Sequence, residues 1–217
     1  MGDNDSQNLG LAEVLAPHRC ATLVIDLQND MVRPEGVVGR AGNDVTAIAA
    51  IVPRCADFIE ASRAYGVPVV HVQTTTLRDG ASDSPSWLRA KGSIVNTGGF
   101  CLEGSWGAQI CEEVAPAEGE VVITKHRSSA FHQTNLDLVL RSMGVETVVV
   151  IGEQTPGCVE ATFRDAAYHD FYNVLLEDCV AAYDEEQHEA SLLIQRRRHD
   201  VCTADDVLAI WKAAARA

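Results

Sequence analysis

Short apolar runs alternate with stretches of helical periodicity along most of this chain. Apolar runs bounded by turn residues predict buried strands, whereas apolar residues recurring at three- and four-residue steps predict helices. The run ATLVID, for example, predicts a strand that ends in an acidic residue, and the steps from Val45 to Ile59 predict a helix closed by Gly66. These criteria predict six strands, over residues 21–26, 67–73, 120–124, 146–152, 173–178 and 199–203.

Helices are predicted between these strands and after the last one. The longer ones are expected over residues 43–65, 134–143, 158–170, 185–198 and 205–216, and shorter ones near 11–15 and 105–114. Strands that alternate with helices are typical of βα units, in which right-handed crossovers cover both faces of a parallel sheet. The expected fold class is therefore α/β, a three-layer α/β/α sandwich with a six-stranded parallel sheet, Rossmann-like.

Two regions show no sustained period. Residues 1–19 are expected to be a frayed leader, apart from the short helix near 11–15, and residues 74–104 to be a long irregular loop. Long loops inside a compact domain are more often functional than idle. Because no linker or repeat interrupts the rest, residues 20–217 are predicted to form one domain.

Composition excludes several classes of protein. With 17 Lys+Arg against 31 Asp+Glu, the formal net charge of −14 argues against a nucleic-acid binder or a protein of anionic membrane surfaces. No apolar run approaches the roughly 18 residues of a membrane span, and the polar start lacks a signal-peptide pattern. The seven cysteines include no CxxC pair, so packing thiols in a reducing cytoplasm are expected.

The ends of three predicted strands carry reactive side chains. Asp26 ends the first strand, Lys125 follows the third, and Cys158 follows the fourth through a Gly/Pro turn. In an open parallel sheet, ligands bind at the carboxyl ends of the strands. A helix N-terminus and Lys125 would both lower the pKa of Cys158, and Asp26 would accept its proton. The alternative is a packing thiol, a turn former and a solvated strand end that do not act together.

Three segments resemble the isochorismatase-like cysteine hydrolases, a superfamily that includes nicotinamidases, N-carbamoylsarcosine amidohydrolase, ureidoacrylate amidohydrolases and biuret or triuret hydrolases. The resemblance runs from about residue 20 to 203 and is carried by VIDLQND (24–30), KHRSSAF (125–131) with TNLDLVLRSMG (134–144), and GEQTPGCVEATFRDA (152–166).

The resemblance implies a site as well as a fold. It implies an Asp26–Lys125–Cys158 triad, a cis peptide bond between Glu153 and Gln154, and an oxyanion hole made by the backbone N–H groups of Gln154 and Cys158. It also implies a homodimer or homotetramer.

Departures from the family pattern narrow the chemistry. Nicotinamidases carry an Asp-x-His pair that helps to hold a metal, whereas the corresponding stretch here reads HVQTTTLRDG, so neither a metal nor another cofactor is expected. Isochorismatases proper cleave a vinyl ether without needing the cysteine, so Cys158 favours amide chemistry. Ser128 stands where ureide-type members often have an aromatic residue, which leaves the pocket wall undefined.

Five further residues are candidates for substrate contact, each with an alternative role. The amides are candidates to bind the substrate or to stabilise a turn. The indoles are candidates to cover the pocket or to anchor the loop, and the arginine to bind a substrate carboxylate or to pair with an acid such as Asp165. These candidates are Gln28, Asn29, Trp87, Trp106 and Arg127.

The leading hypothesis is a metal-independent amidohydrolase of small amide, carbamoyl or ureide compounds. One alternative is a hydrolase of an isochorismate-like vinyl ether, which would release pyruvate. Another is a catalytically idle family member that serves as a binding subunit, in which Cys158 would alkylate no faster than a free thiol. The substrate itself is not specified by the sequence.

Overall fold

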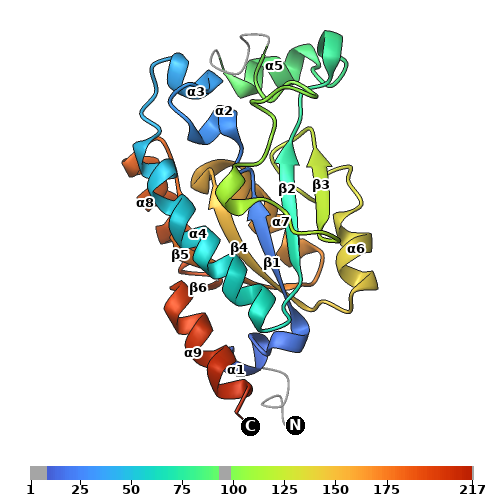
Figure 1. Cartoon of the computed structure of the whole chain (residues 1–217), viewed down its shortest axis with the longest axis vertical. Coiled ribbons are helices and arrows are strands. Elements are labelled where there is room, and N and C mark those ends of the chain that lie inside the picture. Colours follow the sequence, from blue (N-terminus) through green and yellow to red (C-terminus); the bar gives the residue numbers. More distant parts are fainter. Residues whose placement is uncertain (1–8, 93–98, 217) are drawn as a thin grey trace.

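The computed structural model describes residues 9–92 and 99–216 and contains one six-stranded sheet in the order β3-β2-β1-β4-β5-β6 (Figure 1). Every neighbouring pair of strands is parallel. This confirms the predicted fold class and all six predicted strands. The strands are β1 (Cys20–Ile25), β2 (Val69–Thr74), β3 (Val121–Lys125), β4 (Thr147–Glu153), β5 (Tyr172–Ala181) and β6 (Asp200–Cys202).

Helices cover both faces of the sheet, as expected for buried parallel strands. One buried cluster joins alternate strand residues to α4 (Thr46–Ala64) and α9 (Ala204–Ala214). The opposite cluster joins the other set of strand residues to α6, α7 and α8. These three helices are α6 (Leu136–Ser142), α7 (Glu160–Tyr168) and α8 (Glu185–Gln195).

The segments beyond the carboxyl edge of the sheet contain more regular secondary structure than the sequence pattern predicted. Three short helices stand beyond the arrowheads in Figure 1, namely α2 (Asn29–Val32), α3 (Val37–Arg40) and α5 (Pro85–Lys91). The α5 helix lies in the stretch expected to be irregular, and its start is fixed by Ser84, whose hydroxyl accepts from Trp87 N at 3.2 Å. Such helices are too short to show a period, so caps and turns define them.

Two expectations about shorter elements were wrong. Instead of a helix over 105–114, only a single 3₁₀ turn forms, at Glu112–Val114. The expected fraying does not extend over residues 9–19, whereas residues 1–8 lie outside the described range. Here α1 (Leu11–Val14) and a 3₁₀ turn (Pro17–Arg19) lead into β1, and Trp211 Nε1 donates to the Leu15 carbonyl at 2.9 Å.

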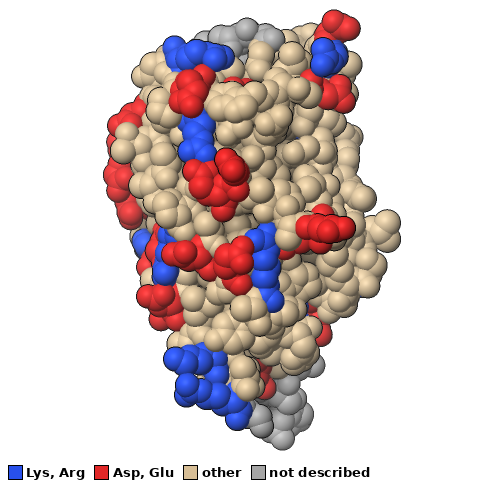
Figure 2. All heavy atoms as spheres, in the orientation of Figure 1, with Lys and Arg blue, Asp and Glu red and all other residues tan. Residues whose placement is uncertain are grey.

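Charged side chains of both signs are interspersed on the face shown in Figure 2. Acidic residues meet basic ones at many points, for example where Arg54 lies 2.9 Å from Asp178 and 2.7 Å from Asp205. Arg196, which directly follows α8 and belongs to the basic run in the sequence, pairs with Glu177. Within residues 9–92 and 99–216, no helix is both long enough and apolar enough to cross a membrane.

Gly152 permits the close approach of β4 to β1. Its φ of +119° is in a region that other residues rarely adopt, and a Cβ there would overlap the Ile25 carbonyl oxygen. We expect Gly152→Ala to lower the free energy of unfolding by about 3 kcal/mol, since it combines backbone strain with overpacking. Chemical denaturation measures this loss.

The matched control for this prediction is Gly66→Ala. Gly66 also has a positive φ, of +70°, but nothing lies within 4 Å of a Cβ built there. Gly66→Ala should lower the free energy of unfolding by only about 1 kcal/mol. Equal losses in the two variants would contradict the crowding argument.

Candidate active site

The carboxyl ends of four neighbouring strands place polar side chains at one point of the sheet edge. Asp26 directly follows β1, Thr74 ends β2 and Lys125 ends β3. Cys158 lies in a π-helical turn, Thr155–Val159, between β4 and α7. Because β2 separates β1 from β3, Thr74 lies between the acid and the lysine. The structure thus brings together the three residues that the sequence placed at this edge, and adds a fourth.

Lys125 is the centre of this cluster. Its Nζ lies 2.7 Å from Asp26 Oδ2 and donates to Cys158 Sγ at 3.1 Å. It also donates to Thr74 Oγ1 at 2.7 Å and to the Arg127 carbonyl at 3.2 Å. The side chains of Lys125 and Asp26 are fully buried. A charge so buried is tolerated only when it is paired and hydrogen-bonded, and this ammonium is both.

Thr74 connects the two charges, and the sequence analysis did not identify it. Its hydroxyl accepts from Lys125 Nζ and donates to Asp26 Oδ1 at 3.1 Å. Its place at the end of a strand was the available signal, but a hydroxyl there is common and drew no attention. The bond to Asp26 uses one carboxylate oxygen and leaves the other for Lys125.

We expect Thr74→Val to lower the free energy of unfolding by about 2 kcal/mol, because two hydrogen bonds to buried charges are lost with little change in volume. Urea denaturation measures it. Thr76→Val is the control, because the buried Thr76 hydroxyl has no hydrogen-bond partner in the described structure. A loss at Thr76 as large as at Thr74 would contradict the bridging role.

The protonation states follow from burial and charge. Burial raises the pKa of Cys158 to about 12, and the Lys125 charge offsets only part of this effect. For Lys125, burial alone lowers the pKa, but the charges of Asp26 and Cys158 hold it above its usual value. The expectation that the Cys158 pKa is lowered was therefore wrong for the resting site, where desolvation outweighs the lysine. Slow alkylation of Cys158 would not by itself identify an idle protein.

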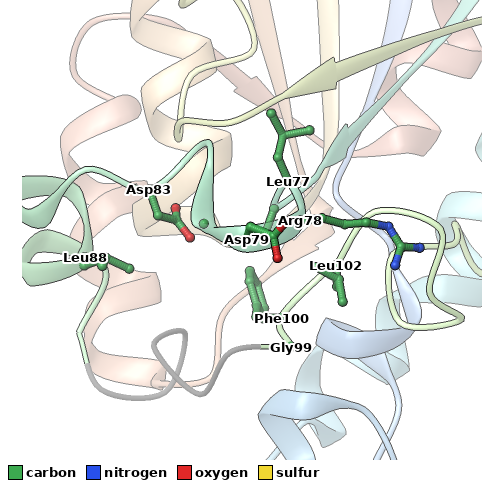
Figure 3. Close-up of a pocket in the computed structure, with 10 residues that line it drawn as sticks. Leu77, Arg78, Asp79, Asp83, Leu88, Gly99, Phe100 and Leu102 are labelled. Atoms are coloured by element: carbon green, nitrogen blue, oxygen red, sulfur yellow. The ribbon is translucent and has the colours of Figure 1, made fainter.

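Cys158 opens into a cavity of about 500 Å³ above the sheet edge. Its wall combines apolar side chains from the short helices with polar groups from the strand ends. A larger hollow, of about 880 Å³, lies beside it (Figure 3), but its lining includes none of Asp26, Lys125 and Cys158. We place the candidate site in the smaller cavity because the reactive groups are there. Its lining includes Met31, Trp87, Phe100, Arg127, Glu153 and Tyr183.

The two amide candidates for substrate contact serve the fold instead. Gln28 Nε2 donates to the carbonyls of Thr74 at 2.9 Å and Ala108 at 2.7 Å, and its Oε1 accepts from Thr74 N at 2.7 Å. Asn29 Nδ2 donates to the Trp106 carbonyl at 2.9 Å. Neither side chain is among those that line the 500 Å³ cavity. Of the two roles left open by the sequence, holding a turn is the one that fits.

The aromatic and basic candidates for substrate contact differ in whether they line the cavity. Trp87 lines the cavity, whereas Trp106 is 46% exposed and is not among the lining residues. Arg127 also lines the cavity, and its guanidinium lies 4.8 Å from the centre of the Trp87 ring. It donates to the carbonyl of Ser82 at 3.0 Å. In the described ranges, no ion pair joins it to Asp165, which was the alternative considered for it.

Glu153 is a further buried acid that the sequence analysis did not single out. It ends β4 and is 2% exposed, and the peptide bond that follows it, to Gln154, is cis, as the family resemblance implied. Burial first, and then the nearby charge of Asp26, raise its pKa well above the usual value. No pattern in the sequence indicates that this carboxyl lines the cavity, since strand-end acids are usually solvated.

Metal-binding geometry was tested on the donor groups themselves. Among the described residues, no group of three or more His, Cys, Asp and Glu side chains is arranged to hold a metal ion. The acids at the candidate site are already engaged, since Asp26 pairs with Lys125 and Glu153 contacts Tyr183.

A parallel sheet with a buried acid, lysine and thiol at its carboxyl edge is the arrangement expected of isochorismatase-like hydrolases. The chain belongs to this family, because the isochorismatase domain model matches residues 20–206. It is 33% identical over 190 residues to ureidoacrylate amidohydrolase RutB of Methylobacterium radiotolerans, which covers 82% of this chain and 73% of that protein. The same enzyme of Azorhizobium caulinodans is 32% identical over 176 residues, or 76% of this chain and 77% of that protein.

Solved structures agree with this placement. An isochorismatase family protein from Desulfovibrio vulgaris superposes with a TM-score of 0.76 and 32% identity, covering 88% of this chain and 98% of that one. N-carbamoylsarcosine amidase from Thermoplasma acidophilum superposes with a TM-score of 0.68 and 28% identity, over 86% and 97% of the two chains. These likenesses confirm the predicted superfamily and support its amidohydrolase branch.

Proposed function

We propose that this protein is a metal-independent cysteine amidohydrolase that cleaves a C–N bond of a small amide, carbamoyl or ureide compound. The observation that carries the proposal is the buried cluster in which Lys125 Nζ lies 2.7 Å from Asp26 Oδ2 and 3.1 Å from Cys158 Sγ. Relatives that are named for ureidoacrylate and N-carbamoylsarcosine support a linear C–N substrate.

The first step forms a bond between sulfur and the substrate carbonyl carbon. The Asp26 carboxylate accepts the Cys158 thiol proton, and the thiolate attacks. Because burial raises the pKa of the thiol, it is protonated at rest, and Asp26 must remove this proton before the sulfur can attack. Lys125 stabilises the thiolate through the contact to Sγ. In this proposal the developing oxyanion accepts hydrogen bonds from the backbone N–H groups of Gln154 and Cys158.

The next steps release nitrogen and then restore the thiol. Collapse of the tetrahedral intermediate breaks the C–N bond, and Asp26 passes its proton to the leaving nitrogen, so ammonia or an amine departs. The enzyme is left as a thioester or thiocarbamate on Cys158. Asp26 then takes a proton from water, the hydroxide attacks the same carbon, and the C–S bond breaks. The thiolate that leaves regains its proton from Asp26.

Trp87 and Arg127 are the proposed substrate contacts in the cavity wall. The Trp87 indole N–H is buried without a hydrogen-bond partner in the described structure, so it is free to donate to a substrate oxygen. The Arg127 guanidinium, 4.8 Å from the centre of the Trp87 ring, holds the ring by a cation–π contact and adds positive charge to this wall. Gln28 and Asn29 act on the substrate only by fixing the backbone around the site.

An assay of ammonia release tests the proposed function. Ureidoacrylate, N-carbamoyl amino acids, biuret and simple aliphatic amides are incubated with the purified protein, and ammonia is measured by a coupled enzymatic assay. We expect turnover of at least one ureide or carbamoyl compound. Pyruvate release from isochorismate, unchanged when Cys158 is replaced, would instead identify a vinyl ether hydrolase. Turnover of neither kind would identify the idle binding subunit.

A homodimer or homotetramer and a cytoplasmic location remain predictions from family resemblance and composition. Large apolar side chains are exposed on neighbouring elements α6, α7 and β5, including Leu138, Tyr168 and Tyr172. Exposed apolar side chains of this size support association between copies. Light scattering on the purified protein measures the oligomeric state directly.

A further inference from the structure

Glu153 is a buried acid in the wall of the candidate site that the proposed mechanism does not use. Its side chain is 2% exposed, and it lines the same 500 Å³ cavity as Cys158. Its Oε2 is buried without a hydrogen-bond partner in the described structure. Because a buried polar atom without a partner is costly, native structures seldom retain one unless a ligand or water completes it.

The contact between Glu153 and Tyr183 indicates which form of the carboxyl is present. The Tyr183 hydroxyl donates to the Met31 carbonyl at 3.1 Å, and Glu153 lies close enough to this hydroxyl to raise its pKa. Because the one proton of the hydroxyl is used by Met31, only its lone pairs are left to face Glu153, so this contact is favourable when Glu153 is the protonated partner. A neutral Glu153 then donates through one oxygen to Tyr183 and keeps the other as a carbonyl acceptor.

The charges around Glu153 also favour the neutral form. Asp26 would repel a second negative charge on Glu153, and the thiols of Cys101 and Cys158, whose pKa values are raised by burial, are neutral and supply no positive charge to offset it. The nearby cation is Lys125, and it is already paired with Asp26 at 2.7 Å. Glu153 therefore holds an unpaired carbonyl oxygen within the wall of the cavity that Cys158 also lines.

We propose that Glu153 is a substrate-binding residue whose Oε2 accepts the N–H of the nitrogen that bears the organic substituent next to the scissile carbonyl. This inference rests on the proposed function and narrows the substrate class to amides and ureides that carry an N–H at this position. Compounds with a fully substituted nitrogen there leave Oε2 unpaired and are rejected. The residue after Glu153 is Gln154, whose N–H is the proposed oxyanion donor, and both residues line the same cavity.

The discriminating experiment compares two variants on paired ligands. Glu153→Gln keeps a carbonyl acceptor and a donor for Tyr183, whereas Glu153→Met keeps the length and removes both. The ligands are N-carbamoylglycine and its N-methyl counterpart, N-carbamoylsarcosine, with ureidoacrylate and its N-methyl counterpart as a second pair. Binding is measured by calorimetry in the Cys158→Ala background, which prevents turnover, and kcat and KM are measured with Cys158 present.

We expect the N–H ligand to bind at least about tenfold more tightly than its N-methyl counterpart, since one buried hydrogen bond distinguishes them. Glu153→Gln should retain this preference, and Glu153→Met should reduce it to less than about threefold, mainly through binding of the N–H ligand. Tyr183→Phe is the comparison for a purely structural role, because it removes the hydroxyl contact but leaves Oε2, and it should not alter the preference.

Several results would overturn the proposal. These are an unchanged preference in Glu153→Met, loss of the preference in Glu153→Gln, an equal loss in Tyr183→Phe, or no binding of any N–H ligand. If the preference appears in binding but no ammonia is released by the protein with Cys158 intact, the proposed function fails while the role of Glu153 stands. If ammonia is released but the preference does not depend on Glu153, only the present inference fails.

The protonation state of Glu153 can be measured through the pH dependence of the unfolding equilibrium. Glu153 is protonated in the fold but ionises in the unfolded chain above a pKa of about 4.3, so rising pH favours unfolding. The unfolding constant of the wild-type protein, divided by that of Glu153→Gln, should rise about tenfold per pH unit from pH 5 until the pH reaches the raised pKa of Glu153 in the fold. Asp26, Lys125, Cys101, Cys158 and Tyr183 are common to both proteins and cancel. A flat ratio between pH 5 and 7 would show that Glu153 is ionised.

Discussion

Cys158→Ser should reduce ammonia release at least about 1,000-fold while the protein stays folded. The substitution changes one atom, and the hydroxyl is a much weaker acid than the thiol that Asp26 must deprotonate. The Lys125 ammonium, 3.1 Å from Sγ, stabilises a thiolate but cannot make a buried alkoxide accessible at neutral pH. Initial rates on the best substrate of the assay panel measure the effect.

Cys202→Ser provides the matched control for the nucleophile. Cys202 is partly exposed at the end of β6, away from the cavity, so its replacement should leave turnover unchanged. Circular dichroism and the unfolding midpoint establish that both variants fold. Retention of more than a tenth of the activity by Cys158→Ser would rule out covalent catalysis through this residue.

Asp26→Asn should lower kcat about 100-fold to 10,000-fold, since it removes the group that moves the proton in both halves of the reaction. It should also lower the free energy of unfolding by about 3 kcal/mol or more, because the fully buried Lys125 loses its counter-charge. Asparagine is chosen because Asp26 has a φ of +53°, a conformation that Asn tolerates better than most residues. Turnover and guanidinium denaturation measure the two effects.

The control for Asp26→Asn is Asp79→Asn. Asp79 also has a positive φ, of +59°, but its side chain is exposed. Its replacement should change the free energy of unfolding by less than about 0.5 kcal/mol. If Asp26→Asn were as stable and as active as this control, neither the ion pair nor the proton transfer would hold.

The sheet and the three reactive residues were predictable because both depend on local signals. Apolar runs mark buried parallel strands, and the residue after each run lies at the carboxyl edge, which is how Asp26, Lys125 and Cys158 converge. Thr74 lies at the same edge, but a hydroxyl has no distinctive chemistry until the two charges it connects are placed.

The parts of the site that the sequence did not predict depend on contacts between residues that are distant in the chain. Gln28 bonds to Ala108, 80 positions away, and the Asp30 carboxylate accepts from Cys101 N at 2.7 Å. These bonds decide which residues face the cavity, and no sequence period records them. The thiol pKa was misjudged for a related reason, since the degree of desolvation at Cys158 is set by walls that come from several segments.

The site is built partly on strand ends and partly on a short helix, and this has an evolutionary consequence. The proton-transfer groups are fixed on strand ends, where any change disturbs the sheet, whereas Trp87 is carried by α5, a seven-residue helix whose start is fixed by its own Ser84 cap. Selection can therefore exchange this segment among descendants, and with it the compounds admitted, without rebuilding the reactive centre. New specificities in this lineage should arise first by substitution and insertion around residues 75–92.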